Sequence, residues 1–281
     1  MAKKTIDDVE VAGKRVLVRV DFNVPLAEDR SITDDTRIRA ALPTLWHLLE
    51  NGASLVLMTH LGRPRGQRQP AMSLAPVARL LHNLLGTSVH LAPDCVGDEV
   101  ETMARDLLPG QVLLLENLRF HAEEEANDPA FARSLAALGD LFVNDAFGTA
   151  HRAHASTDGI TRHFSHNVSG YLMAQEMKYL TEALTDPPRP FVAILGGAKV
   201  SGKVEVIENL LEKVDTLMIG GGMAFTFFKA MGLEIGDSLL EEETLGVADR
   251  ILTTAGKMSG IELLLPVDCL VADRMAADAQ T

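Results

Sequence analysis

The chain has few cysteines, no long apolar run and no excess of positive charge, and each of these deficits excludes a class of protein. Its 281 residues include only two cysteines, Cys95 and Cys269, which stand far apart without metal-like spacing. Two lone thiols fit a reducing compartment and argue against a disulfide framework. No apolar run reaches the roughly 18 residues of a membrane-spanning helix, and no apolar segment follows the N-terminal lysines as in a signal peptide. We therefore expect a cytoplasmic protein with no membrane partner.

The charge balance excludes nucleic acid as a partner but contains a bias of its own. The formal net charge is −13, which disfavours nonspecific binding to polyanions. With 47% hydrophobic and 23% charged residues, the chain can form a packed core. Up to Gly170 it holds fourteen arginines but three lysines. Codon composition would explain this bias, and so would arginines that bind phosphate or carboxylate through their planar guanidinium groups.

Apolar, β-branched runs alternate with amphipathic stretches along the whole chain. The expected strands are Arg15–Asp21, Ser54–Thr59, Val89–Ala92, Val112–Glu116, Leu141–Asp145, Val192–Leu195, Thr216–Ile219 and Glu262–Val267. The expected helices include Asp35–Leu49, Ser73–Leu85, Val96–Leu108 and Asp128–Leu138, the last with Asp128 as N-cap before a proline. Because the strands are apolar on both faces, this alternation predicts an α/β fold with buried parallel sheets.

A domain boundary is also visible. Gly170–Leu184 reads as one amphipathic helix, and the three prolines of Thr185–Pro190 cannot continue it. We therefore expect a first domain over residues 1–169, a connecting helix and hinge over 170–188, and a second domain over 189–281. The acidic run Glu123–Glu125 is interpreted as a solvated loop or helix start.

Polar and basic side chains follow the expected strands of the first half, where ligands bind in open parallel sheets. Asp21 and Asn23 come at the end of the first strand, two residues apart, so on an extended segment they face one side and can bind a hydroxyl. His60 follows the second strand. The four arginines expected at the same edge are Arg37, Arg63, Arg119 and Arg152. One surface arginine is usually only solvated, but four arginines with a histidine predict a site for a small, multiply charged anion.

Two further patterns admit more than one interpretation. His151 and His154 could be a metal pair, but no third or fourth ligand is apparent, and we prefer a role without metal. Gly197–Lys203 fits the start of a phosphate-binding P-loop, and backbone amides at the start of the following helix could hold phosphate. Val204 stands where a P-loop needs a hydroxyl for magnesium, so we regard that match as accidental. A nicotinamide-dependent enzyme is disfavoured because no G-x-G-x-x-G occurs.

Six motifs together resemble the phosphoglycerate kinase family, in that family's order and over essentially the whole chain. They are Arg19–Pro25 (RVDFNVP), His60–Pro64 (HLGRP), Glu116–Phe120 (ENLRF), Asn144–Ser156 (NDAFGTAHRAHAS), Leu195–Lys203 (LGGAKVSGK) and Ile219–Phe227 (IGGGMAFTF). The resemblance implies two Rossmann-like three-layer domains, the second incomplete here, with 3-phosphoglycerate bound by the first and ADP or ATP by the second. It also implies a monomer with small-molecule substrates.

The resemblance implies a role for each matching residue. Asp21 and Asn23 match positions that meet the hydroxyl and carboxylate end of the acid, and Arg37 matches the arginine that stabilises the phosphoryl group in transfer. The phosphate clamp with its neighbours matches His60, Leu61, Gly62, Arg63, Arg119 and Arg152. On the nucleotide side, Lys199 resembles a catalytic lysine, and phosphate or adenine contacts match Gly197, Lys203, Gly220 and Gly221.

The implied reaction is reversible phosphoryl transfer from 1,3-bisphosphoglycerate to Mg-ADP, a step of glycolysis, by positioning and charge stabilisation after the two domains close. Mg²⁺ enters with the nucleotide. Gly202 departs from family members that carry aspartate there, so we assign no metal ligand. Because family chains continue further, we expect exposed apolar faces in the second domain and little kinase activity from these 281 residues alone. The alternative is a non-enzymatic binding module, which an activity measurement on this chain would distinguish.

Overall fold

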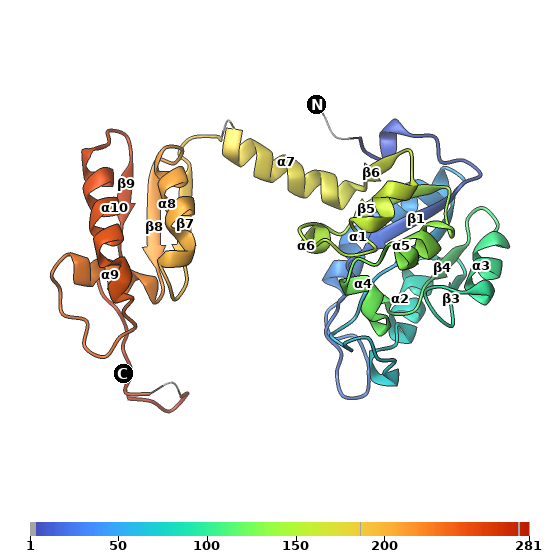
Figure 1. Ribbon diagram of the computed structural model, residues 1–281, viewed down its shortest axis with the longest axis horizontal. Helices are drawn as coiled ribbons and strands as arrows, with labels where there is room; N and C mark the ends of the chain where they lie inside the picture. Colours follow the sequence, from blue (N-terminus) through green and yellow to red (C-terminus); the bar gives the residue numbers. More distant parts are fainter. Residues whose placement is uncertain (1–3, 186, 275, 281) are drawn as a thin grey trace. The chain divides into compact units, whose positions relative to one another are not determined.

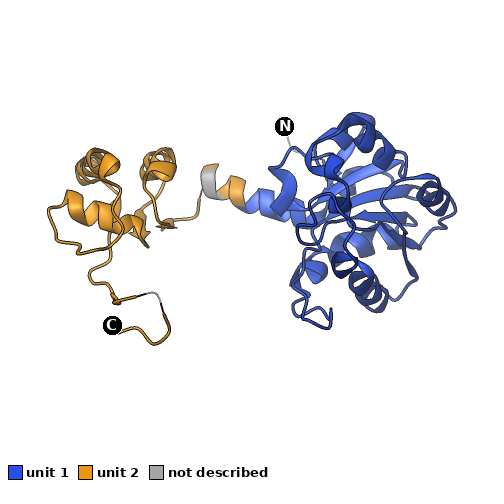
Figure 2. Ribbon diagram, turned by 60° about the horizontal axis from the view of Figure 1, so that its bottom comes forward, with its two compact units in different colours: residues 1–179 blue, residues 180–281 orange. Residues whose placement is uncertain are grey.

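The computed structural model describes residues 4–185, 187–274 and 276–280, and the chain divides into two compact units, Met1–Tyr179 and Leu180–Thr281 (Figure 2). The division falls within one helix, α7 (Tyr171–Thr185), which overlaps the helix expected as the connector. The expected ranges 1–169, 170–188 and 189–281 include residues 1–3, 186, 275 and 281, which lie outside the described part of the chain. None of the described helices is long and apolar enough to cross a bilayer.

The first unit is built on a parallel sheet of six described strands in the order β3-β4-β2-β1-β5-β6 (Figure 1). The strands are β1 (Arg15–Val20), β2 (Ser54–Met58), β3 (Val89–Leu91), β4 (Val112–Leu114), β5 (Leu141–Asp145) and β6 (Asn167–Ser169). Five were expected from their apolar runs, and the expected α/β class with parallel sheets is confirmed. The short edge strand β6 was not expected, because its sequence is too polar and too brief to form a recognisable run.

Helices cover both faces of this sheet. They are α1 (Thr36–Glu50), α2 (Ala75–Leu85), α3 (Asp98–Arg105), α4 (Ala122–Glu125), α5 (Pro129–Ala136) and α6 (Phe147–Ala150). One buried cluster joins Val16 and Leu55 to α1 and α2, and a second joins Leu17 and Val56 on the opposite face to α3 and α5. Successive residues of a strand point to opposite faces. The strands therefore have to be apolar on both sides, as their sequences are.

Local signals fix where the helices begin. The carboxylate of Asp128 accepts hydrogen bonds from the amides of Ala130 and Phe131, at 2.9 and 2.8 Å, and Pro129 occupies the first helical position. This is the expected N-cap of α5. Helix α2 ends at Gly86, which adopts the left-handed conformation at φ +67°. The chain then returns to the sheet.

The second unit has a parallel three-stranded sheet in the order β7-β8-β9, with β7 (Val192–Gly196), β8 (Thr216–Gly220) and β9 (Glu262–Leu264). Its described helices are α8 (Val204–Leu211), α9 (Met223–Ala230) and α10 (Leu245–Lys257). These helices pack on one face of the sheet, around Leu217 and Ile219. The other face is open, since Ile194 is 75% exposed and Val192 is 43% exposed. The expected exposure of apolar surface in this unit is confirmed. The expectation that both faces of the sheet are buried is wrong for β7-β8-β9.

Candidate active site

The carboxyl ends of β1 and β2 are joined by polar contacts. Asp21, directly after β1, accepts a hydrogen bond at Oδ2 from Nη1 of Arg37 at 2.6 Å. The amide of Asn23 donates to Oδ1 of Asp21 at 3.3 Å, and the side-chain oxygen of Asn23 accepts from the amide of Gly62 at 2.9 Å. Asp21, Asn23 and Arg37 therefore meet, as expected, and the structure ties them to the loop that follows β2.

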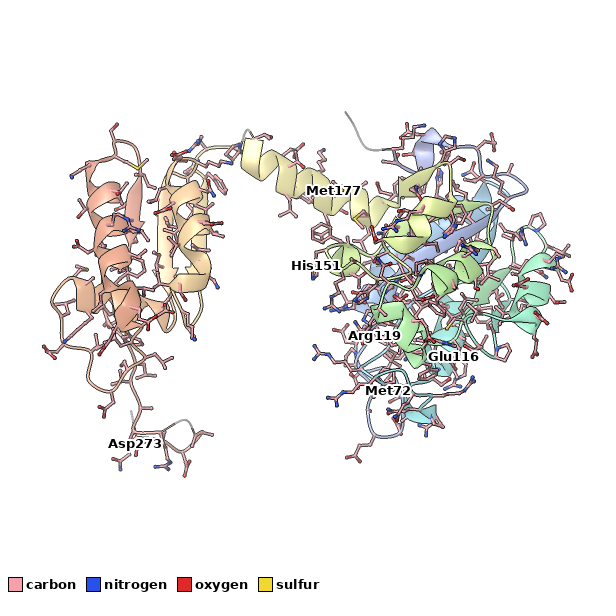
Figure 3. The ribbon with its side chains drawn as sticks, in the orientation of Figure 1. Met72, Glu116, Arg119, His151, Met177 and Asp273 are labelled. Carbon is pink, nitrogen blue, oxygen red and sulfur yellow. The ribbon has the colours of Figure 1, made fainter. Side chains whose placement is uncertain are left out.

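Arg119 lies against that loop from the end of β4 (Figure 3). Its Nη1 donates to the carbonyl of Gly62 at 2.8 Å, and its Nε lies 3.5 Å from Oε1 of Glu125 in α4. The side chain is 6% exposed. Burial lowers the pKa of Arg119 while the charge of Glu125 raises it, and nearby Arg152 and Arg63 lower it again. The group remains a cation in a region where positive charges gather.

Asn117 holds the loops after β2 and β4 together. It is fully buried, and its side-chain amide donates to the carbonyls of Leu61 at 2.8 Å and Met72 at 3.0 Å. Its side-chain oxygen accepts from the amides of Leu61 and Arg119, at 3.2 and 3.1 Å. Gly62 completes the turn at φ +62°, and a side chain there would meet the sulfur of Met72 at 3.0 Å. The sequence suggested no role for Asn117 beyond its place in a motif.

His60 lies at the centre of the basic residues and is uncharged. It is 4% exposed. Burial, followed by the charges of Arg19, Arg119, Arg152 and Arg37 in that order, lowers the pKa of His60 to about 2. Three of the four arginines expected at this edge of the sheet thus lower the pKa of the same imidazole. The fourth, Arg63, is exposed in the loop after β2, and its charge acts on Arg119.

Three candidate functional residues were not identified from the sequence: Arg19, Ser156 and Glu124. Arg19, the last but one residue of β1, is 1% exposed. Its Nε donates to the hydroxyl of Ser156 at 2.9 Å, and its Nη2 lies 3.2 Å from Nδ1 of His60. Ser156 in turn donates to Glu124 at 2.6 Å. The expected solvated character of Glu123–Glu125 is wrong for Glu124, which is 1% exposed. A charged residue inside the apolar run of β1 was the available signal for Arg19.

The possible metal ligands lie beside this site. His151 is exposed, and His154 lies with Nδ1 3.9 Å from Oε1 of Glu124. One group in the described residues has three potential ligands close together, Asp94, Cys95 and His121. There Nε2 of His121 is 2.6 Å from Oδ1 of Asp94 and the buried Cys95 thiol donates to the Asn117 carbonyl at 3.7 Å. Burial raises the pKa of this thiol well above its usual value, so Cys95 stays a protonated thiol, which is not the form that binds a metal.

The expected nucleotide residues lie in two loops of the second unit, after β7 and after β8. Gly221 has φ +69°, and a side chain on it would meet the Gly197 amide nitrogen at 3.0 Å. The Met223 amide donates to the Gly197 carbonyl at 2.7 Å. A side chain at Gly197 would meet Nζ of Lys203 at 3.2 Å. Gly197, Lys203 and Gly221 are thus brought together in one place.

The helix start after Gly197 differs from the expected phosphate cradle. The amides of Val200 and Ser201 donate to Oε2 of Glu241, at 2.8 and 2.9 Å, and the Ser201 hydroxyl also donates to Glu241. These two donors are therefore already occupied by a carboxylate, and the expectation that they cradle phosphate is not supported. Lys199 is exposed beside them, and Gly220 ends β8. A side chain at Gly202 would meet nothing within 4 Å.

Comparisons with known proteins agree with one another. The family model for phosphoglycerate kinase matches residues 6–281. Phosphoglycerate kinase of Chloroherpeton thalassium is 60% identical over 281 residues, covering 100% of this chain and 70% of the relative, and that of Acaryochloris marina is 58% identical, covering 99% and 70%. These relatives are longer than this chain, as expected for the family.

Solved structures give the same result. Phosphoglycerate kinase from Coxiella burnetii is similar with a TM-score of 0.84 and 41% identity, over 99% of this chain and 70% of that one. The enzyme from Pyrococcus horikoshii is similar with a TM-score of 0.75 and 32% identity, over 92% of this chain and 67% of that one.

Proposed function

Because the chain belongs to the phosphoglycerate kinase family, we propose that the basic residues at the sheet edge of its first unit bind 3-phosphoglycerate. The family reaction is the reversible glycolytic transfer of a phosphoryl group between 1,3-bisphosphoglycerate and ADP. One observation supports the assignment: the positive charges of Arg37, Arg119 and Arg152 all lower the pKa of His60, which is buried and uncharged. Such a concentration of guanidinium groups around a neutral donor suits a small molecule with a phosphate and a carboxylate.

The proposed ligand has three recognisable groups, and the site offers a partner for each. Arg63, Arg119 and Arg152 are proposed to bind the phosphate, with His60, Leu61 and Gly62 beside them. Asp21 and Asn23 are proposed to meet the hydroxyl and the carboxylate end. The Asp21 carboxylate already accepts from Arg37 at 2.6 Å, so an arriving anion competes with Asp21 for that guanidinium.

The proposed acceptor in the direction that consumes ATP is the carboxylate of 3-phosphoglycerate. That oxygen is already an anion, so no general base is required. Catalysis then consists of positioning and of charge stabilisation on the equatorial oxygens of the phosphoryl group. Arg37 and Lys199 are the residues proposed to supply this charge. Both are exposed and therefore accessible to substrate.

The second unit is proposed to bind ADP or ATP with its Mg²⁺, which enters as part of the substrate. Lys203, whose Nζ lies over Gly197, is the proposed phosphate ligand. Gly197, Gly220 and Gly221 are proposed to leave the backbone accessible to the nucleotide. No carboxylate at Gly202 is available to order the metal. We further propose that the protein acts as a cytoplasmic monomer on small molecules, without nucleic acid, consistent with its net charge of −13.

Isothermal titration of 3-phosphoglycerate into this chain tests the proposal. We expect one site, and we expect Arg119→Ala to raise the Kd at least about tenfold, because a hydrogen bond to a charged group contributes about 1.5–3 kcal/mol. Arg162→Ala is the matched control, because Arg162 is exposed and forms a surface ion pair with Asp158 at 3.1 Å. If the folded chain does not bind the acid, or if both variants weaken binding equally, the assignment is wrong.

A further inference from the structure

A chain of four buried polar side chains runs beneath the proposed 3-phosphoglycerate site. Glu124, Ser156, Arg19 and His60 are 1%, 0%, 1% and 4% exposed. They come from α4, from the segment after α6, from β1 and from the end of β2. Segments up to 137 residues apart in the sequence are therefore joined by side-chain contacts.

The contacts follow one another without a gap. Ser156 donates through its amide to Oε2 of Glu124 at 3.0 Å and through its hydroxyl to Oε1 at 2.6 Å. The same hydroxyl oxygen accepts from Nε of Arg19 at 2.9 Å, and Nη2 of Arg19 lies 3.2 Å from Nδ1 of His60. Nη1 of Arg19 donates to the carbonyl of Val20. Arg19 is thus held on three sides.

Electrostatics give Glu124 a distinct part in this arrangement. Burial lowers the pKa of Arg19, and so do Arg119 and Arg152, whereas Glu124 and Asp21 raise it. A buried cation among other cations is stable only when a buried anion compensates it. Glu124 is that anion within the described residues, and Ser156 is the neutral link, because one hydroxyl can accept from Arg19 while donating to Glu124.

The hydrogen bond between Arg19 and His60 also fixes the imidazole. A guanidinium has donors and no acceptor, so Nδ1 of His60 must be the acceptor. The ring proton of the neutral imidazole then resides on Nε2. If Arg19 moved, Nδ1 would be free to take the proton, and His60 would change its tautomer or become charged.

We propose that Glu124 and Ser156 are positioning residues of the 3-phosphoglycerate site: through Arg19 they hold His60 as the Nε2-protonated neutral tautomer, so that it offers the ligand an N–H donor. This inference rests on the proposed function of the basic site. Neither residue touches the ligand in this arrangement. Ser156 acts on His60 through two hydrogen bonds and Glu124 through three, and His60 is the group proposed to contact the ligand.

The test combines Glu124→Gln and Ser156→Ala with the control Glu123→Gln, an exposed residue of the same helix. Long-range ¹H–¹⁵N spectra of ¹⁵N-histidine-labelled chain report the His60 tautomer, with His60→Gln used to assign its signals. Titration calorimetry gives the Kd for 3-phosphoglycerate, and Trp46 fluorescence monitors folding. We expect the Nε2–H tautomer in the wild type and in Glu123→Gln. In the other two variants we expect a changed tautomer or protonation state and at least about fivefold weaker binding.

The outcomes separate this inference from the function on which it rests. If the folded wild type does not bind the acid, the proposed function fails, and the tautomer still reports whether Glu124 holds His60. If the wild type binds and both folded variants keep its tautomer, positioning is refuted whether binding weakens or not. Should Glu124→Gln fail to fold, Ser156→Ala decides, because it removes only the linking hydroxyl and keeps both charges.

Discussion

Replacing Asn117 by alanine should both destabilise the first unit and weaken substrate binding. This side chain makes four hydrogen bonds of 2.8–3.2 Å to the backbone of Leu61, Met72 and Arg119. It is fully buried, and Leu61 and Arg119 are only 4% and 5% exposed. The substitution would leave most of these backbone groups without a partner and without water to replace it.

The expected magnitude follows from that count. Four hydrogen bonds with a net contribution of about 1 kcal/mol each, and more where the abandoned group stays buried, predict a loss of about 3–5 kcal/mol. A domain of this size has a total stability of only about 5–15 kcal/mol. Binding should weaken as well, because the same bonds hold the Leu61–Gly62 turn and the start of the Arg119 segment. We expect the Kd for 3-phosphoglycerate to rise about tenfold or more.

The sequence contains a single tryptophan, Trp46, which lies in α1. Urea unfolding followed by its fluorescence therefore reports the first unit separately from the second. Asn83→Ala, at an exposed position of α2, is the control and should change the free energy of unfolding by less than about 0.5 kcal/mol. A loss below about 1 kcal/mol for Asn117→Ala, with an unchanged Kd, would refute the reasoning that this amide joins the loops.

Three further predictions use the same chain. The pKa of His60 falls from 6.5 to about 2 on folding. The unfolded state therefore binds more protons than the native state below pH 6.5, so the free energy of unfolding decreases as the pH is lowered below 6.5, by up to about 1.4 kcal/mol per pH unit. In His60→Gln this part of the slope between pH 7 and 5 should vanish, as measured by urea unfolding; equal slopes would contradict it. Ile194→Lys, on the open sheet face, should shift the melting temperature by less than about 2 °C, whereas Leu217→Lys on the covered face should prevent folding of the second unit, as circular dichroism would detect. Glu125→Gln should tighten 3-phosphoglycerate binding by about two- to fivefold, because it removes an exposed competitor for Arg119; weaker binding in calorimetry would contradict this.

The sequence predicted the sheet of the first unit because buried parallel strands need apolar residues on both faces. Leu141–Asp145 matches its expected bounds, and the other expected strands of this unit begin at the expected residue. The edge strand β6 was not predictable in this way, since only one of its three residues is apolar and buried. In the second unit, the sequence of β7 is equally apolar, but which face a helix covers depends on packing that no local pattern records.

The site was predictable to the extent that topology alone gathers residues. Side chains that follow parallel strands must converge at one edge, so Asp21, His60 and Arg119 could be placed together before any contact was known. The supporting residues could not. Glu124 reads as part of a solvated acidic run, and only its contact with Ser156, 32 residues away, shows that it is buried. Such roles depend on pairs that are distant in sequence and therefore have no local signature.

The carboxylates around the basic residues fall into two physical classes, and this division explains how the site can hold like charges and still bind an anion. Asp21 pairs with Arg37, whose side chain is 53% exposed, and Glu125, itself 48% exposed, pairs with Arg119. Water reaches one partner of each pair, so these ion pairs contribute little and exchange readily. An arriving phosphate or carboxylate can replace them at small cost. Glu124 is buried with all its contacts to the protein, so no ligand can displace it. Asp21 and Glu125 thus compete with the ligand, whereas the buried Glu124 keeps Arg19 in place. For this reason two adjacent glutamates of α4 should have opposite effects on binding when each is neutralised.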